Sequence, residues 1–261
     1  MSLAQRVEGV RHRIEQACRR CGRSPSSVTL VAVTKTIPVD TMTEAIGLGL
    51  IELGENRVQE ALAKQDALGS RVKVQGKQIG LEPSTFNLEP AVRWHLIGHL
   101  QRNKAKHAVQ LFDVIHSVDS LTLVEELERH AGNQDEDRGV HRVPFTAHPI
   151  EVFIQVNVSE ESTKSGCRAE DAEPIARAVM ASRHLAFRGL MTMAPLAQQP
   201  ESARPVFQRL RELRDALARQ LPITGDRLQL SMGMSHDFEI AIEEGADVVR
   251  IGTAIFGAQR G

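Results

Sequence analysis

Short apolar runs rich in β-branched residues recur along almost the whole chain, and most are followed by a stretch in which apolar residues have helical spacing. The first run, Val28–Val33, comes after the punctuating residues Gly22 and Pro25. Seven further runs share these properties: Ile51–Leu53, Val92–Ile97, Phe112–Ser117, Glu151–Val158, Ala186–Met191, Arg227–Met232 and Asp247–Ile251. Spread over residues 28–252, eight units occupy about 28 residues each, which is typical of repeated strand–helix units.

This repetition predicts one α/β domain over residues 1–261, folded as a (β/α)8 barrel of the TIM type. A doubly wound open sheet is the competing architecture, because it also alternates strands and helices. The barrel is expected over residues 28–257. Residues 1–24 are expected to form a preceding helix, because apolar residues recur on one helical face: Leu3, Val7, Val10, Ile14 and Ala17. Residues 70–91 and 132–149, which are interrupted by Pro and Gly, are interpreted as loop insertions.

The composition excludes several classes of protein. Hydrophobic residues make up 41% and charged residues 25%, as in an ordinary soluble globular protein. The 32 basic and 33 acidic residues give a net charge of −1, which provides no general attraction to nucleic acid or to an anionic membrane. The apolar runs are too short to span a bilayer, and no secretory signal precedes the odd set of three cysteines. A reducing cytoplasm is therefore the expected location.

Metal binding is not expected. Cys18 and Cys21 have the spacing of a metal or redox pair, but they lie within the first helical pattern and no matching second pair exists. No histidine and carboxylate cluster has convincing metal-ligand spacing.

In a parallel barrel the active site forms at the carboxyl ends of the strands. The first strand leads to Lys35, which has the same parity as Val31 and Val33 and is therefore expected to project into the barrel mouth. Such a lysine can pair with a carboxylate or extend into water, or it can serve as a reactive amine. Arg250 on the eighth strand is expected to share this cavity, because closure makes the first and last strands neighbours. A nearby cation and desolvation would both favour the neutral amine that attacks an aldehyde.

Two glycine-containing segments follow the seventh and eighth strands, where barrels often bind phosphate. Gly252 precedes a short helix, which lets backbone N–H groups approach a phosphate closely. Ser235 is expected to cap a helix over residues 236–244 and to offer its hydroxyl to the same phosphate. Arg250 has a second interpretation, as half of a structural ion pair.

Other strand ends also carry polar residues. Asn56 is either a turn residue after Gly54 or a group that contacts a bound ring or the reactive amine. His95 and His99 surround the end of the third strand, and His95 can equally be a hydrogen-bonded core residue beside Trp94. The basic segment 102–107 is interpreted as the solvated face of a helix.

These motifs, in this order, resemble those of the pyridoxal phosphate homeostasis proteins, a family of alanine-racemase-like barrels that bind pyridoxal 5′-phosphate (PLP). The resemblance covers nearly the whole chain. The segments that carry it are Val31–Pro38, Gly54–Glu60, Trp94–Lys104, Ser162–Gly166, Gly189–Met191, Ser231–Ser235 and Arg250–Gly257. One departure is visible: position 57 is Arg, where relatives often have Tyr.

The resemblance implies a monomeric or weakly associating barrel with PLP as its cofactor. It implies that Lys35 holds PLP as a Schiff base, that the phosphate lies near Ser235, Gly252 and Thr253, and that Arg250 contacts the pyridine nitrogen. An arginine cannot keep that nitrogen protonated as a carboxylate does, so the ring is a weaker electron sink.

Related racemases also use a tyrosine from a second domain as a base, whereas this sequence contains no tyrosine and ends soon after the eighth strand. We therefore expect a non-catalytic protein that stores, buffers and delivers PLP to PLP-dependent apoenzymes. The alternatives are a PLP-dependent racemase-like enzyme and a phosphate-binding barrel without PLP. Release of the cofactor would involve mobile loops, for which residues 159–166 and 192–200 are the candidates.

Overall fold

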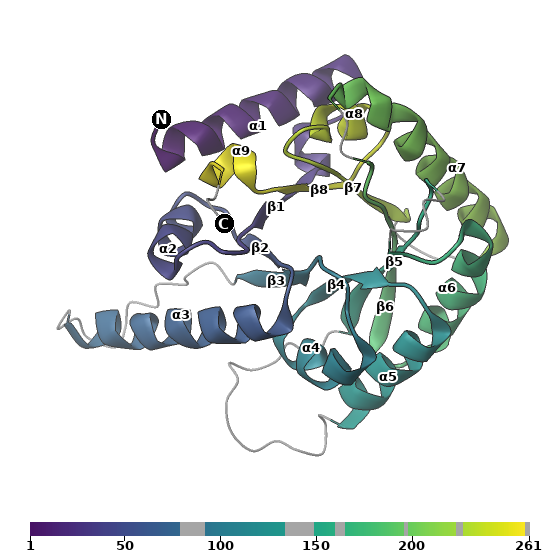
Figure 1. Cartoon of the computed structure of the whole chain (residues 1–261), viewed down its shortest axis with the longest axis horizontal. Helices are drawn as coiled ribbons and strands as arrows, with labels where there is room; N and C mark the ends of the chain where they lie inside the picture. Colours follow the sequence, from purple (N-terminus) through teal and green to yellow (C-terminus); the bar gives the residue numbers. More distant parts are fainter. Residues whose placement is uncertain (79–91, 134–148, 160–164, 196–197, 223–226, 259–261) are drawn as a thin grey trace.

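A closed barrel of eight parallel strands forms the centre of the protein (Figure 1). The computed structural model describes residues 1–78, 92–133, 149–159, 165–195, 198–222 and 227–258. The strands are β1 (Thr29–Val33), β2 (Glu52–Glu55), β3 (Arg93–Leu96), β4 (Val114–Val118), β5 (Ile150–Gln155), β6 (Leu185–Met191), β7 (Gln229–Met234) and β8 (Val248–Ile251). Each predicted strand lies within three residues of an observed one. Because β1 pairs with β8, the barrel is confirmed and the open sheet is excluded.

Helices surround this barrel and connect its strands. They are α1 (Leu3–Arg20), α2 (Val39–Gly47), α3 (Val58–Gln78), α4 (Ala105–Leu111), α5 (Leu121–Gly132), α6 (Ala172–Ala181), α7 (Arg204–Gln220), α8 (Phe238–Glu243) and α9 (Thr253–Phe256). Short 3-10 turns are η1 (Pro25–Ser27), η2 (Arg102–Lys104), η4 (Ala169–Asp171) and η5 (Pro200–Ala203).

The N-terminal helix α1 completes the outer ring. It begins with a capping box in which the backbone N–H of Gln5 donates to Ser2 Oγ and the backbone N–H of Ser2 donates to Gln5 Oε1. Its buried apolar face packs against α8 and α9. Because α9 has only four residues, α1 takes the place beside β8 that a longer final helix would fill (Figure 1).

Alternation along the strands sends every second side chain into the barrel. An interior cluster, separate from the larger core between strands and helices, consists of Val31, Val114, Phe153, Met191 and Val248. This fixes the inward parity of β1, β4 and β8, and with it the inward direction of His116 and Arg250 on the latter two.

The opposite end of the barrel, at the amino ends of the strands, is closed by charged pairs. Arg93 Nη2 lies 2.9 Å from Glu151 Oε2, and Arg188 Nη2 lies 2.6 Å from Glu151 Oε1. Arg93 also lies 3.6 Å from Glu52. These half-buried pairs leave the carboxyl ends of the strands as the functional face.

The prediction of a loop over residues 70–91 is wrong in its first part, because α3 continues to Gln78. Residues 70–78 contain one glycine and no proline, and a single glycine is tolerated within a helix. Residues 79–91 lie outside the described part of the chain. The predicted insertion at 132–149 begins where α5 ends, at Gly132, and its residues 134–148 are also outside the description.

Candidate functional site

Lys35 follows β1 in a tight turn at the carboxyl end of the barrel. The backbone N–H of Ile37 donates to Thr34 O at 2.9 Å, which closes the turn around Lys35 and Thr36. Thr36 has a φ of 62°, and it is the one non-glycine residue with positive φ in the described part of the chain. A β-branched residue in this region stores strain on the order of 1–3 kcal/mol.

The side chain of Lys35 is exposed, so the expectation of a desolvated amine is not met. The physical reason is its place in a turn two residues beyond the end of β1, where the mouth opens to solvent. Within the described residues its ammonium group has no hydrogen bond or ion pair. The amine is therefore accessible and uncommitted.

Arg250 lies inside the barrel as its parity predicted, and it is 4% exposed. It pairs in register with Val31 of the neighbouring strand β1, four residues before Lys35. Arg250 and Lys35 therefore come from adjacent parts of the barrel, Arg250 from its buried interior and Lys35 from the exposed turn after β1.

Among the described residues Arg250 has no carboxylate within ion-pair distance, and an ion pair was its alternative interpretation. Its Nη1 donates to Ser231 O at 2.8 Å and to Ser231 Oγ at 2.6 Å, and its Nη2 donates to Thr192 O at 2.8 Å. Burial lowers the pKa of Arg250 to about 10, so the guanidinium remains charged at neutral pH. Neutral oxygen atoms therefore fix the position of Arg250, and no carboxylate of the described residues is bonded to its guanidinium.

A chain of hydrogen bonds continues from Arg250 across the barrel interior. Ser231 Oγ lies 2.8 Å from His116 Nδ1, His116 Nε2 lies 2.9 Å from His95 Nδ1, and His95 Nε2 lies 2.5 Å from Glu52 Oε2. Every contact is satisfied when both imidazoles are neutral, with Ser231 donating to His116, His116 to His95 and His95 to Glu52.

His116 is the centre of this chain. It is fully buried and stacks on Phe153, with ring centroids 4.6 Å apart. Burial is the largest cause that lowers the pKa of His116 well below its ordinary value, and the positive charge of Arg250 acts in the same direction. His95 is therefore a hydrogen-bonded core residue, which was one of its two interpretations, and it supports the inner face of the site.

The ends of β7 and β8 meet at Ser235. Its Oγ accepts hydrogen bonds from the backbone N–H groups of Gly252 at 3.2 Å and Ala254 at 3.3 Å. Because both bonds use the hydroxyl oxygen as acceptor, the hydroxyl hydrogen is free to donate to an anion. Gly252 also packs against β1, since a Cβ there would lie 3.3 Å from Val33 Cβ. Exposed Thr253 follows directly.

The expected capping role of Ser235 is wrong. Helix α8 begins only at Phe238, and Asp237 instead accepts the backbone N–H of Met234 at 2.6 Å. The hydroxyl of Ser235 instead links the segment after β7 to the segment after β8.

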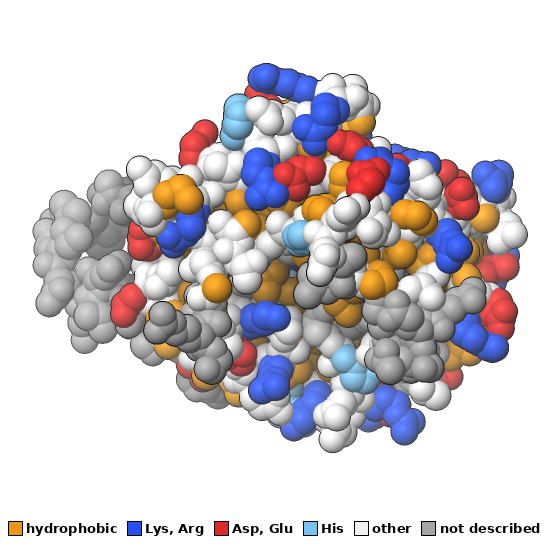
Figure 2. Space-filling view, turned by 45° about the horizontal axis from the view of Figure 1, so that its top comes forward, with side chains coloured by type: hydrophobic (Ala, Val, Ile, Leu, Met, Phe, Trp, Pro, Cys, Tyr) orange, Lys and Arg blue, Asp and Glu red, His pale blue; other side chains and the backbone are white. Residues whose placement is uncertain are grey.

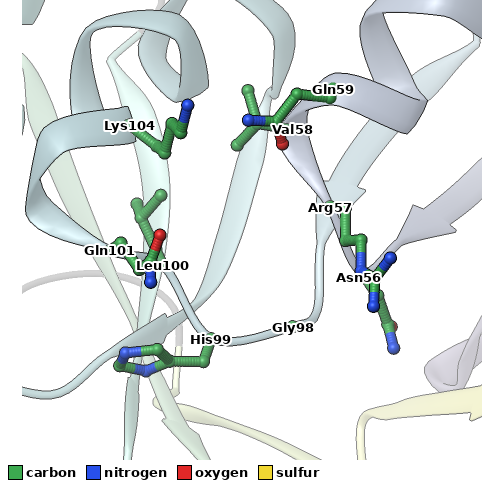
Figure 3. Close-up of a pocket in the computed structure, with 9 residues that line it drawn as sticks. All are labelled: Asn56, Arg57, Val58, Gln59, Gly98, His99, Leu100, Gln101 and Lys104. Carbon is green, nitrogen blue, oxygen red and sulfur yellow. The ribbon is translucent and has the colours of Figure 1, made fainter.

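Asn56 lies at the end of β2, against the backbone that leaves β3. A Cβ on Gly98 would lie 2.3 Å from Asn56 O, so only glycine permits this approach. Together they border a pocket of about 410 Å³. Figure 3 shows Asn56 and Arg57 on one side of it and Gln101 and Lys104 on the other.

Exposed Arg57 and His99 also line this pocket, and no acidic residue does. The pocket is thus compatible with an anionic group. Arg57 supplies part of the positive charge at this pocket.

Behind the Lys35 turn lies a buried ionic cluster that the sequence analysis did not identify as functional. Lys64 on α3 donates to Glu55 Oε1 at 2.8 Å and to Glu60 Oε1 at 2.7 Å. Burial raises the pKa of Glu55 despite its hydrogen bonds from Lys64 and Thr34. Burial also opposes ionisation of Glu60, but hydrogen bonds from Lys64 and Thr36 lower its pKa overall.

The sequence contained one signal for this cluster, the spacing Glu60–Lys64, which places two opposite charges on one helix face. Ser231, Thr192 and His116 were also missed. For Ser231 and His116 inward parity was the available signal, because polar residues at inward positions of a barrel require partners, whereas Thr192 contacts Arg250 through its backbone carbonyl, which no sequence pattern indicates.

In the described part of the chain, no three His, Cys, Asp or Glu side chains are grouped as ligands for a metal ion. Cys18, Cys21 and Cys167 are free thiols. None of the described helices has the length and apolar character needed to cross a membrane.

The closed eight-stranded barrel, with Lys35 in the turn after its first strand, has the fold of the alanine-racemase-like class. The family model described as alanine racemase, N-terminal domain, matches residues 6–260. The pyridoxal phosphate homeostasis protein of Aquifex aeolicus is 38% identical over 261 residues, with 100% of each chain covered. The chain belongs to the pyridoxal phosphate homeostasis protein family.

Solved structures agree with this assignment. PipY of Synechococcus elongatus PCC7942, solved without PLP, is 34% identical, with a TM-score of 0.77 over 98% of this chain and 100% of that chain. The structure of PipY with PLP bound is 33% identical, with a TM-score of 0.75 and the same coverage.

Proposed function

We propose that this protein binds PLP at the carboxyl end of its barrel and takes part in vitamin B6 homeostasis by storing, buffering and delivering it. The observation that carries the proposal is an exposed lysine in the turn after β1, next to the end of β8, where the hydroxyl of Ser235 accepts two backbone N–H groups and keeps its own hydrogen for an anion. The name of the Aquifex relative and the PLP complex of PipY support the same ligand.

The residues present fit the chemical groups of PLP. The amine of Lys35 would condense with the aldehyde, forming a C=N bond and releasing one water. Ser235, Gly252 and Thr253 would border the phosphate, to which Ser235 would donate its hydroxyl hydrogen. Arg250 would contact the pyridine nitrogen, and Asn56 would contact the ring or the Schiff base.

The same residues favour a carrier over an enzyme. When bound, PLP supplies an electron sink only if its pyridine nitrogen is electron-poor. The guanidinium of Arg250, held by Ser231 and Thr192, can donate a hydrogen bond to that nitrogen but cannot readily transfer a proton to it. The sequence also contains no tyrosine to act as a second base. Rapid racemisation of L-alanine by the PLP-loaded protein would favour the enzymatic alternative instead.

Borohydride trapping tests the binding mode. Purified protein is incubated with PLP, reduced with borohydride, digested and analysed by mass spectrometry. A Schiff base at Lys35 predicts absorption of visible or near-ultraviolet light by the complex and a reduced adduct on the peptide that contains Lys35. Lys35→Ala should abolish this adduct.

Lys106→Ala is the matched control, because Lys106 is an exposed lysine on α4 outside the proposed site. It should label as the wild type does. Adducts distributed over many surface lysines, with Lys35 unmodified, would contradict the proposal.

We also propose that the carrier is a monomer and that PLP-dependent apoenzymes are its recipients. Transfer requires water or an amine to reach the bound aldehyde carbon, and the exposure of the Lys35 turn allows this access. Loading of an apoenzyme by PLP-saturated protein, faster than by release into solution alone, would support direct delivery.

A further inference from the structure

Three ionisable side chains meet directly behind the Lys35 turn. Glu55 is the last residue of β2, and Glu60 and Lys64 lie one helical turn apart on α3. The side chain of Glu55 is fully buried and that of Lys64 is 9% exposed. Since Lys64 contacts both carboxylates within 2.8 Å, the three groups form one ionic cluster.

This cluster binds the peptide groups on both sides of Lys35. Lys64 Nζ donates to Thr34 O at 2.6 Å, and the backbone N–H of Thr36 donates to Glu60 Oε1 at 2.5 Å. Thr34 Oγ1 also donates to Glu55 Oε1 at 2.6 Å. The carbonyl before Lys35 and the amide after it are therefore both fixed by side chains of α3, and the Thr34 side chain is fixed by Glu55 of β2.

The backbone of the turn needs such fixing. Thr36 has its φ of 62° at the third position of the turn, where glycine is normally preferred. A strained conformation of this kind persists only when the surrounding structure determines it. The bond from Thr36 to Glu60 acts on the strained residue itself.

Stability alone explains the cluster poorly. The desolvation cost of a buried ion pair often offsets its attraction, so such a pair is weak evidence for stability. Here Glu55 Oε2 is buried and has no hydrogen-bond partner among the residues that the structure describes, which adds to that cost. Burying these charges costs desolvation free energy, and their hydrogen bonds are made to one turn. The cluster is therefore better explained by a need to position that turn.

We propose that Glu55, Glu60 and Lys64 are positioning residues that hold the Lys35 backbone so that its amine stays at the barrel mouth, ready to meet an aldehyde. This inference rests on the proposed function, because the aldehyde is that of PLP.

The test measures the rate at which PLP labels Lys35, by borohydride trapping at timed intervals. Lys64→Met and Glu60→Ala should each slow labelling by about tenfold or more, since a small misplacement of a reacting group has effects of this size. Glu60→Gln retains an oxygen that can accept the Thr36 N–H, so it should stay within about threefold of wild type.

Arg23→Met is the control for a general loss of stability. It removes an ion pair of 2.9 Å between Arg23 and the largely buried Asp247, at the opposite end of the barrel. It should lower the melting temperature without slowing the labelling of Lys35.

A second substitution separates positioning from stability. Thr36→Gly, added to Glu60→Ala, should restore most of the labelling rate, because glycine adopts a positive φ without strain. Three results would overturn the inference. The first is that Thr36→Gly and Glu60→Ala have additive effects on the labelling rate. The others are that Arg23→Met slows labelling as much as the cluster variants do, or that Lys64→Met and Glu60→Ala both label at the wild-type rate. If the wild type itself forms no adduct at Lys35, the proposed function fails and this inference fails with it.

Discussion

The hydroxyl of Ser235 links two strand ends through a single oxygen. It accepts the N–H groups of Gly252 and Ala254, and its hydrogen remains available for a phosphate. Ser235→Ala should therefore weaken PLP binding by about 1–2 kcal/mol, or roughly five- to thirtyfold in Kd. A fluorescence titration measures this, and Ser26→Ala on the exposed turn η1 should bind as the wild type does. Equal affinities in all three proteins would contradict the assigned role.

His116 provides a prediction about pH. Its pKa is lowered in the folded protein, first by burial, so the unfolded chain binds a proton more readily as the pH falls below about 6.5. The stability contributed by neutral His116 is thus complete above that pH and decreases below it, by at most about 1.4 kcal/mol per pH unit.

Thermal unfolding between pH 5 and 8 measures this effect. His116→Gln removes the titrating group while retaining polar atoms, so the pH dependence of its stability should be shallower than that of the wild type. Parallel curves for the two proteins would show that His116 does not titrate as we describe.

At the level of elements, helix α1 substitutes for a long helix after β8. Ile14 is 6% exposed on the face that packs against the barrel. Ile14→Ala should lower the free energy of unfolding by roughly 2–4 kcal/mol, as for other buried aliphatic residues. Leu62→Ala on α3 is the control, because Leu62 is 42% exposed and should cost far less. Chemical denaturation compares the two, and equal losses would indicate that α1 is only loosely attached.

The elements were easier to predict than their contacts. Parity placed Arg250 inside the barrel, because alternation along a strand is fixed by backbone geometry. The same reasoning failed for the burial of Lys35, because the strand ends at Val33 and a turn carries the lysine into solvent.

Contacts between segments distant in the sequence were harder to predict than the elements. The cluster of Glu55 and Lys64 brings together the end of a strand and the second turn of a helix, and the depth at which they meet depends on how α3 packs. Ser235 was identified as a phosphate contact but assigned the wrong structural role, because the first residue of α8 depends on Asp237. Residues 160–164 and 196–197, within the loops expected to be mobile, lie outside the described part of the chain.

At the scale of the whole molecule, the large hydrophobic residues exposed in the described part of the chain come from different elements. They are Met1, Leu62, Leu121, Met180 and Met193. Figure 2 shows basic and acidic side chains interspersed over one face. We expect sedimentation velocity at micromolar concentration to give a monomer of 28.8 kDa, with or without PLP. A dimer at these concentrations would contradict this prediction.

The central claim is that Lys35 after β1 and the phosphate site at the ends of β7 and β8, on neighbouring strands of the same barrel mouth, hold PLP between them. A crystal structure of the protein soaked with PLP tests this most directly. We predict electron density continuous from Lys35 Nζ to the cofactor, with the phosphate against Ser235 and the backbone of Gly252 and Thr253. Cofactor density in the pocket beside Lys104, or on a surface lysine, with the Lys35 amine unmodified, would contradict the account.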